Sequence, residues 1–527
     1  MKKIILIMFL LSTALYSQSV PMDYSLSASR VFKTQDASPN SNVIDDIVIV
    51  GDTIFLATGN GVSISTDDGE SWNNFGDIPE FEGVYGSRLT YKNGVLYVGV
   101  WHSEEILGGS EEPFGDGIRI TSDLGNTWTS IDQPVDTMAD STIVYGVSTL
   151  RALPTTVTGQ NFILDIETTS NAIWIAARAG GLRRSFDNGQ TWERVVLPPD
   201  YLDYIHPDSS YTFQLSGVEG SFVSEGNLNH IPFSILVIDD NNIYVGTAGG
   251  INRTTDGGSS WTKFNHTNQN NPISANHVWS MSYDETDGSI WACTWKAEGD
   301  TEFNAISTSN DSGANWTTFF QGTKTEDIAL RHVYTSPTES SREIISVNRD
   351  DGLFRSSDGG YTWTKAPTIY DYVTRIELKT ESMFSIELKE NAFGADIYIG
   401  SNEGLVRMQE GNIPWDGDWR IYFTTGESTE QGTETFAFPN PFSPLQRNVS
   451  IKYSLTTDMD VTIRVFDFGM NLTRTLIQNA PRFASSEIIQ RWDGRDESGS
   501  YVANGVYFYR IDKGSDEPIF GKILVVK

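Results

Sequence analysis

The stretch "SSDGGYTW", Ser356–Trp363, decides the fold because the chain repeats it. A loop that performs chemistry is seldom needed six times in one chain, whereas a structural turn is, so the pattern indicates a repeat protein. The other copies are "STDDGESW" (65–72), "TSDLGNTW" (121–128), "SFDNGQTW" (185–192), "TTDGGSSW" (254–261) and "SNDSGANW" (309–316). The repeated aspartate and tryptophan are Asp67 and Trp72, Asp123 and Trp128, Asp187 and Trp192, Asp256 and Trp261, Asp311 and Trp316, and Asp358 and Trp363.

Each octet follows a short β-rich run that begins with glycine or alanine. Further strand-like runs precede these, such as "DTIFLAT" and "NIYVGT", so one unit is about four strands in roughly 45 to 70 residues. That unit is typical of a propeller blade. The runs begin at Gly61, Gly117, Gly181, Gly250, Ala305, Gly352 and Gly404. Seven such runs predict an all-β fold with a seven-bladed β-propeller over residues 24–424, in which an N-terminal strand closes the ring beside the last blade.

The octet has the chemistry of a hairpin between the third and fourth strands of a blade. Serine, threonine and aspartate side chains can bond to nearby backbone groups and close the turn from within. Glycine supplies a positive φ, and a tryptophan packed between sheets buries about 150–250 Å². Calcium would need more oxygen ligands than a pair such as Asp67 and Asp68 offers, so we expect no metal. The seventh unit reads "MQEGNIPWDGDW" (408–419) and lacks the octet.

The repeated pattern resembles the Asp-box, or BNR repeat, of sialidases and many other propellers. The resemblance implies the β-propeller fold of the sialidase-like superfamily. It implies little about activity, because these boxes lie on the blade periphery, away from the axial pocket where such propellers bind ligands.

Composition and charge exclude several classes of partner. The chain has 37 basic and 69 acidic residues and a formal net charge of −32, which argues against nucleic acid or an anionic membrane surface. The single cysteine, Cys293, excludes an internal disulfide framework and zinc sites built from cysteines. We read Cys293 as a buried strand residue, and we expect no cofactor.

The first residues indicate export. "MKKIILIMFLLSTALYSQ" has a basic start, a short apolar run and a polar end, which predicts a signal peptide over residues 1–18. The apolar run is too short to cross a bilayer, and no later segment is apolar for long enough. We therefore expect no transmembrane segment and a secreted or cell-surface location.

The C-terminal part predicts a second domain. Residues 425–436 are polar and read as a linker, and residues 437–527 alternate with period two as in a small immunoglobulin-like β-sandwich. The motifs there are "PNPF" (439–442), "VFDFGMNL" (465–472), "WDGRDESG" (492–499) and "NGVYFYRI" (504–511). They resemble the C-terminal sorting domain of type IX secretion and the hook-capping immunoglobulin-like domain. The resemblance implies the type IX secretion machinery as a partner, with passage through the periplasm and attachment to the outer membrane surface or release. A simple spacer or docking role is the alternative.

Candidate ligand-binding residues follow from propeller topology. Loops that enter the inner strands and loops that join second to third strands share one face, where binding function usually lies. The candidates there are Arg88, Arg178, His230, His277, Trp279, Trp295, Arg331, His332 and Arg349, joined by Tyr85, Trp101, His102 and Lys296. Arginine forks and aromatic faces suit an anionic or carbohydrate ligand. Alternatively, these side chains cap the channel and pair with acidic neighbours such as Asp350 and Asp351. A metal site built from His230, His277 and His332 has less support.

These observations favour an exported binding scaffold for a glycan or protein ligand. The alternative is a propeller-type glycoside hydrolase, although the Phe/Tyr-Arg-Ile-Pro signature of sialidases is absent. Enzymes that hydrolyse xyloglucan also carry these boxes, but they use two propellers that face each other. With 69 acidic residues no catalytic carboxylate pair can be singled out. An envelope assembly factor is a third possibility.

Overall fold

The computed structural model describes residues 38–106, 111–215, 227–297, 299–336, 339–372, 376–391, 394–411, 413–423, 435–438, 440–445, 448–483, 485–514 and 516–527. The predicted signal peptide, residues 1–18, lies outside the described residues. So does most of the predicted linker, but Thr435 and Phe436 belong to a strand. This corrects the linker's end, because the alternation of the second domain begins two residues earlier than expected.

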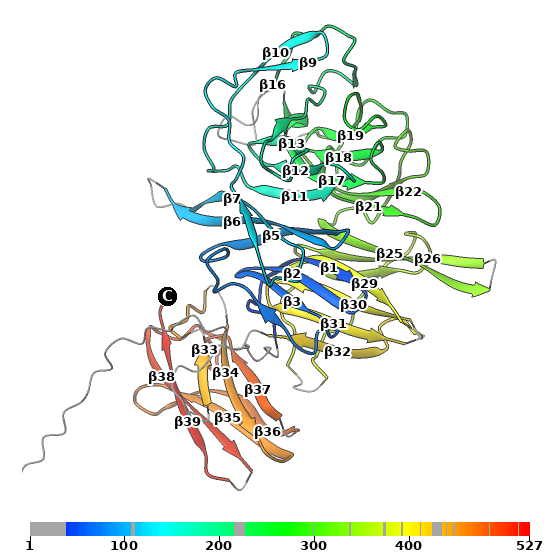
Figure 1. Ribbon diagram of the computed structural model, residues 1–527. Coiled ribbons are helices and arrows are strands. Elements are labelled where there is room, and N and C mark those ends of the chain that lie inside the picture. Colours follow the sequence, from blue (N-terminus) through cyan, green and yellow to red (C-terminus); the bar gives the residue numbers. More distant parts are fainter. Residues whose placement is uncertain are drawn as a thin grey trace, which may run out of the picture. The chain divides into compact units, whose positions relative to one another are not determined.

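The first described part contains seven four-stranded antiparallel units whose strands follow one another in chain order (Figure 1). We number these units blades 1 to 7. A bridge between Gly61 and Tyr85 joins blades 1 and 2 into one sheet, and one added strand extends blade 4. Blade 1 contains β1 (Ile44–Val50), β2 (Thr53–Thr58), β3 (Gly61–Ser65) and β4 (Asn73–Asn74), and blade 2 contains β5 (Tyr85–Lys92), β6 (Val95–Glu105), β7 (Glu111–Thr121) and β8 (Thr129–Ile131). Blade 3 contains β11 (Ile163–Thr168), β12 (Ile173–Ala177), β13 (Gly181–Ser185) and β14 (Glu193–Arg194). Blade 4 contains β17 (Pro232–Val237), β18 (Ile243–Thr247), β19 (Gly250–Thr254) and β20 (Trp261–Phe264).

Blade 5 contains β21 (His277–Asp284), β22 (Ser289–Trp295), β23 (Ala305–Ser309) and β24 (Thr317–Phe319). Blade 6 contains β25 (Thr325–Ser336), β26 (Glu339–Asn348), β27 (Gly352–Ser356) and β28 (Thr364–Lys365). Blade 7 contains β29 (Met383–Glu390), β30 (Ala395–Ser401), β31 (Gly404–Glu410) and β32 (Gly417–Tyr422).

The inner strands form a closed ring. Neighbouring strands in the series β1, β5, β11, β17, β21, β25 and β29 contact each other, and β29 contacts β1. The described residues thus form a ring of seven four-stranded units, and the predicted all-β propeller class is confirmed. Cys293 lies buried in β22, as the strand pattern indicated, and burial raises the pKa of its thiol.

The first described strand, β1, lies beside the inner strand of the last blade, β29, and within the described residues the sheet of that blade takes all four strands from β29–β32. Side chains also join the two blades, because Asp68 of blade 1 accepts hydrogen bonds from Lys389 Nζ at 2.9 Å, Tyr398 Oη at 2.9 Å and Arg407 Nη2 at 2.8 Å. These hydrogen bonds link the last blade to the first.

The repeated octets form the turns between third and fourth strands. Between β13 and β14, Ser185 Oγ donates to Asp187 Oδ1 at 2.8 Å, and the Gly189 and Thr191 amides donate to Ser185 Oγ and Asp187 Oδ1, also at 2.8 Å. Gly189 has φ +85°. The other five copies repeat these three bonds. The turn is therefore closed by its own side chains.

Tryptophans of these turns pack on the preceding blade. The ring of Trp363 stacks on Phe320 at 4.3 Å, and Trp128 meets Phe81 edge-on at 4.8 Å. Trp72 of the first blade contacts Tyr422 of the last. The octets thus fasten neighbouring sheets to each other.

Two insertions add strands outside the blades. β9 (Thr142–Tyr145) and β10 (Ser148–Ala152) follow blade 2, and β16 (Gln214–Leu215) pairs with β10. β15 (Tyr204–Ile205) pairs with β20, and a single 3₁₀ turn, η1 (Leu228–His230), precedes β17. None of the helices in the described ranges is long and apolar enough to cross a membrane.

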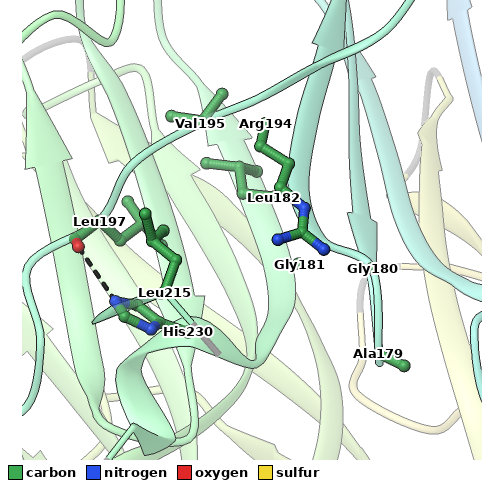
Figure 2. Close-up of a pocket in the computed structure, with 9 residues that line it drawn as sticks. All are labelled: Ala179, Gly180, Gly181, Leu182, Arg194, Val195, Leu197, Leu215 and His230. Carbon is green, nitrogen blue, oxygen red and sulfur yellow. Dashed lines mark hydrogen bonds between the residues drawn. The ribbon is translucent and has the colours of Figure 1, made fainter. Parts of the chain in front are cut away.

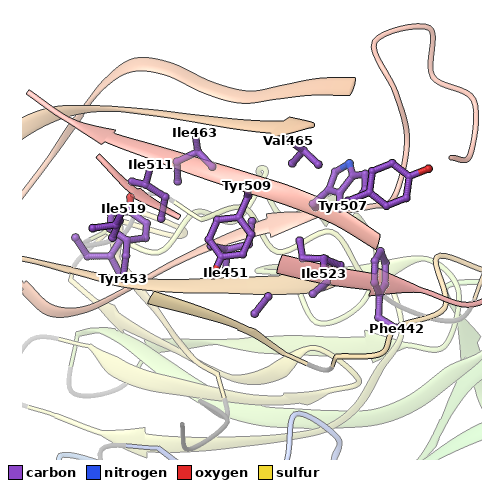
Figure 3. Packing of buried hydrophobic residues seen from close by; sticks show 14 of the residues in the cluster. Phe442, Ile451, Tyr453, Ile463, Val465, Tyr507, Tyr509, Ile511, Ile519 and Ile523 are labelled. Atoms are coloured by element: carbon purple, nitrogen blue, oxygen red, sulfur yellow. The ribbon is translucent and has the colours of Figure 1, made fainter. Parts of the chain in front are cut away.

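The second described part is a two-sheet sandwich with a shared apolar core (Figure 3). In that core the ring of Phe442, from the "PNPF" motif, lies 5.8 Å from Trp492, from "WDGRDESG". The sheets are β33-β34-β37 and β36-β35-β38-β39, with β33 (Thr435–Phe438), β34 (Val449–Leu455), β35 (Met459–Phe466), β36 (Leu472–Arg482), β37 (Ser485–Trp492), β38 (Gly505–Lys513) and β39 (Ile519–Val525).

Candidate functional site

A cavity of about 450 Å³ occupies the propeller axis and is lined by all seven inner strands. Each inner strand has a pairing irregularity near its start, as between Ile44 and Asp46 in β1. The irregularity marks the same register position in every blade. The residues just after it are Asp46, Arg88, Asp165, Ser234, Ser280, Asp327 and Ser385.

The aspartates at this position join adjacent blades. Asp46 Oδ2 accepts the Leu89 amide at 2.7 Å, and Asp165 Oδ2 accepts the Ile235 amide at 2.6 Å. Asp327 Oδ2 accepts the Ile386 amide at 3.2 Å. Each acceptor lies one blade before its donor, so these carboxyl groups hold the ring of inner strands together.

Burial raises the pKa values of several carboxyl groups that line the cavity. It raises the pKa values of Glu167 and Glu387 to about 8 and that of Asp327 to about 7. Arg88 is the cation among the described lining residues. Burial opposes its charge, but neighbouring carboxylates, Asp46 first, outweigh burial and raise its pKa. The cavity therefore combines the positive charge of Arg88 with two carboxyl groups, Glu167 and Glu387, that hold their protons at neutral pH, and with Asp165, whose pKa of about 6 leaves it ionised.

An aromatic cluster lies where the inner strands of blades 4 and 5 begin. The rings of Trp279 and Trp295 stack 4.5 Å apart with an interplanar angle of 7°. His277 lies 5.5 Å from Trp295 and 4.2 Å from Phe233. Burial is the main cause that lowers the pKa of His277 to about 4, with the charge of Lys324 adding to it, so the imidazole is neutral at physiological pH.

Cations cover this cluster. The guanidinium of Arg349 lies 5.5 Å from the ring centre of Trp279 and 5.1 Å from that of Trp295, and Lys324 Nζ lies 5.6 Å from Trp295. Arg349 also pairs with Glu326, a buried carboxylate that lines the cavity. Four predicted candidates, His277, Trp279, Trp295 and Arg349, thus lie together.

A second aromatic cluster occupies the equivalent position of blade 2. Tyr85 pairs with Trp101 in the sheet as His277 pairs with Trp295, and the Tyr85 and Trp101 rings lie 4.9 Å apart. Phe162 extends the cluster at 5.9 Å from Trp101. Sequence reasoning missed Phe162, Phe233 and Lys324. Phe233 could have been found, since it precedes the register position in β17 as Trp279 does in β21.

The remaining candidates lie apart from these clusters. Arg88 is in the channel wall, where Nη1 donates to the Asp45 carbonyl at 3.1 Å. Arg178 follows β12 and is half-buried, and burial lowers its pKa. His230 is buried in η1, with Nε2 3.1 Å from the Leu197 carbonyl (Figure 2). It lines a cavity of about 20 Å³ beside Arg194, enough for about one water molecule.

Arg331 and His332 correct the prediction that placed them at a strand entry. β25 begins at Thr325, so both lie in mid-strand, because the inner strand starts earlier than the sequence pattern suggested. Arg331 pairs with Glu343 and, at 2.8 Å, with Glu410, while His332 Nε2 lies 2.8 Å from Asp284 Oδ2. In the described part of the chain the four candidate arginines therefore do not meet in one anion site.

The three candidate histidines occupy different surroundings: a 3₁₀ turn, an aromatic cluster and an ion pair with Asp284. Within the described ranges, no group of three or more histidine, cysteine or acidic residues could hold a metal ion.

Comparisons with known proteins identify β-propellers. No family model matches the chain. A xyloglucanase of Paenibacillus sp is 25% identical over 270 residues, which are 47% of this chain and 23% of that protein. Xyloglucanase Xgh74A of Acetivibrio thermocellus is 23% identical over 212 residues, 37% of this chain and 18% of that protein. The chain thus matches less than a quarter of the length of these relatives.

Among solved structures, the GH74 xyloglucanase of Xanthomonas campestris is similar with a TM-score of 0.50 and 11% identity, covering 92% of this chain and 66% of that one. At this identity the likeness shows the fold alone.

Proposed function

We propose that the protein is an exported propeller that binds a polysaccharide chain, of the xyloglucan type, at the mouth of its central cavity. The observation that carries the proposal is the pair of aromatic clusters at equivalent register positions of blades 2 and 5. Flat aromatic faces pack on the apolar faces of sugar rings, and nearby polar groups orient the hydroxyls. The xyloglucanases that match part of the chain favour a glycan over a protein ligand.

Binding to xyloglucan by wild-type protein and single variants tests this proposal. Trp295→Ala and Trp101→Ala each remove one half-buried ring from an aromatic cluster, and we expect at least a ten-fold weaker affinity, about 1.4 kcal/mol. Tyr361→Ala is the matched control, because Tyr361 is 78% exposed in an outer turn between β27 and β28. Equal binding by all three variants would refute a ligand site at the mouth.

Hydrolysis is the second candidate, favoured by the carboxyl groups beside the aromatic cluster. A general acid must hold its proton near the working pH, and burial raises the pKa of Glu326 while Arg349 opposes the rise. Release of reducing ends from xyloglucan measures this activity. Glu326→Gln should abolish hydrolysis and keep binding, and no release by wild-type protein would leave binding as the function.

We also propose that residues 437–527 act as a type IX sorting domain and that the signal peptide directs the chain to the periplasm. The four motifs named above support this, since their described residues lie in strands and turns of the sandwich. Deletion of residues 437–527 should trap the protein in the periplasm. Fractionation of cells expressing the full and shortened chains measures this, and unchanged surface delivery contradicts it.

A further inference from the structure

The seam between the last and first blades, blades 7 and 1, is filled by ion pairs. Lys389 lies four residues after the register position of β29, and its Nζ bonds to Asp52 at 2.7 Å and to Asp68 at 2.9 Å. Tyr398, opposite Glu387 in the sheet, donates its hydroxyl to Asp68 at 2.9 Å. Asp52 belongs to the turn after β1, and Asp68 follows the repeated aspartate of the first octet.

The seam between blades 2 and 3 has the same layout with different residues. Lys92 lies four residues after Arg88, and Tyr97 is opposite Thr90, so they match Lys389 and Tyr398. Asn171 lies six residues after Asp165, as Asp52 does after Asp46, and Asn188 follows Asp187 as Asp68 follows Asp67. Both carboxylates of the closing seam are therefore replaced by amides of the same shape.

This replacement leaves Lys92 without a carboxylate partner in the described residues. Its ammonium donates to the Thr168 carbonyl at 2.8 Å. The cations at the equivalent position of blades 6 and 7, Arg331 and Lys389, each bond to two carboxylates. Within the described chain the Tyr97 hydroxyl has no hydrogen-bond partner, unlike that of Tyr398. Hydrogen-bond donors at this seam are thus left for an acceptor from outside.

Two other carboxyl groups lie in the neighbourhood but do not neutralise Lys92. Burial raises the pKa of Glu167 to about 8, so it holds its proton at neutral pH. Asp240 accepts hydrogen bonds from the Ser170 amide and hydroxyl. Neither forms an ion pair with Lys92, since no carboxylate oxygen of the described residues lies within 4.0 Å of its ammonium.

The seam between blades 2 and 3 contains an open cavity of about 380 Å³. Lys92, Tyr97, Asn171 and Asn188 all line it. Phe186, 55% exposed, adds an aromatic face to the lining. The cavity lies at the turns between first and second strands, on the opposite face from the aromatic clusters, and so is separate from the proposed glycan site.

We propose that this cavity binds a small carboxylate-bearing sugar of the hexuronate type, whose carboxylate takes the place that Asp68 holds at the closing seam. Lys92 supplies a point charge for the carboxylate, and a hydrogen bond to a charged group is about twice as strong as a neutral one. The amides of Asn171 and Asn188 and the Tyr97 hydroxyl can bond to sugar hydroxyls. Phe186 offers a face for the sugar ring.

The test uses the full chain and glucuronate as the probe, with binding measured by calorimetry at neutral pH. Lys92→Met should weaken binding at least ten-fold. Asn188→Asp should weaken it equally, because the new carboxylate pairs with Lys92 as Asp68 pairs with Lys389, and this variant should keep or gain thermal stability. Lys389→Met is the matched control: it removes the equivalent cation from the closing seam and should leave glucuronate binding unchanged.

Four outcomes overturn the proposal. The first is that wild-type protein does not bind glucuronate at millimolar concentration, and the second is that Lys92→Met and Asn188→Asp both bind it as wild type does. The third is that inorganic phosphate or sulfate binds at least as well as glucuronate, which would make the cavity a general oxyanion site. Glucose should not bind measurably, and equal binding of glucose and glucuronate would remove the role of Lys92.

Discussion

Truncation of one repeated tryptophan tests whether the octets fasten the blades. Trp261 at the start of β20 is fully buried and packs in one apolar cluster with Trp174 of the preceding blade. Its Nε1 has no hydrogen-bond partner among the described residues, so Trp261→Ala removes packing and no polar contact. Burying about 150–250 Å² at about 25 cal/mol per Å² gives roughly 4–6 kcal/mol, and measured tryptophan-to-alanine losses of about 3–5 kcal/mol agree.

We therefore expect Trp261→Ala to lower the free energy of unfolding by about 3–5 kcal/mol, measured by urea denaturation and far-UV circular dichroism at constant m value. Trp261→Phe, which keeps part of the apolar volume, should lose less and guards against a variant that fails to fold. Tyr361→Ala, at an exposed position of the equivalent turn, should change the value by no more than about 0.5 kcal/mol. A loss below about 1 kcal/mol for Trp261→Ala would refute the fastening role, since burial of this size cannot cost so little.

Two further predictions concern charged groups. Burial raises the folded-state pKa values of Glu167 and Glu387 from 4.5 to about 8. Between these pH values the folded chain therefore binds more protons than the unfolded chain. The free energy of unfolding should consequently fall as the pH rises from about 4.5 to 8. Glu387→Gln should make this fall shallower in urea titrations at several pH values, and an identical slope would contradict the assignment. Asp68→Asn, which gives the closing seam the amide found at Asn188, should lower the free energy of unfolding by about 1–3 kcal/mol, less at 1 M salt. An unchanged urea midpoint would mean that other contacts close the ring.

The fold was largely predictable because its decisive features are local. The hydrogen bonds of an octet join residues no more than four apart, so the residue types at that spacing identify the turn wherever it occurs. The start of β25 was misplaced because "EDIALRHVYT" is strand throughout and offers no turn residue to mark its boundary. The side-chain bonds that link the last blade to the first could not be predicted, because those from Asp68 to Lys389 and Arg407 join residues more than 300 positions apart.

The candidate sites were predictable only in part. Propeller topology placed His277, Trp279, Trp295 and Arg349 on one face, and the structure brings them together. Arg331 and His332 lie apart from this group, because each pairs with carboxylates of other strands. The cavity between blades 2 and 3 could not be predicted from the sequence. The importance of Asn171 and Asn188 appears only when their positions are compared with those of Asp52 and Asp68 at the equivalent seam.

By itself the sequence determined the all-β propeller and the position of its turns, because turn chemistry and strand alternation act between residues close in the chain. The tertiary structure alone decided which charges are paired, which carboxyl groups keep their protons and which seams stay open. These properties depend on burial and on distances across blades. Lys92 and Lys389 show the difference, since they are the same residue type at the same register position. Lys389 bonds to two carboxylates, whereas Lys92 lines a cavity.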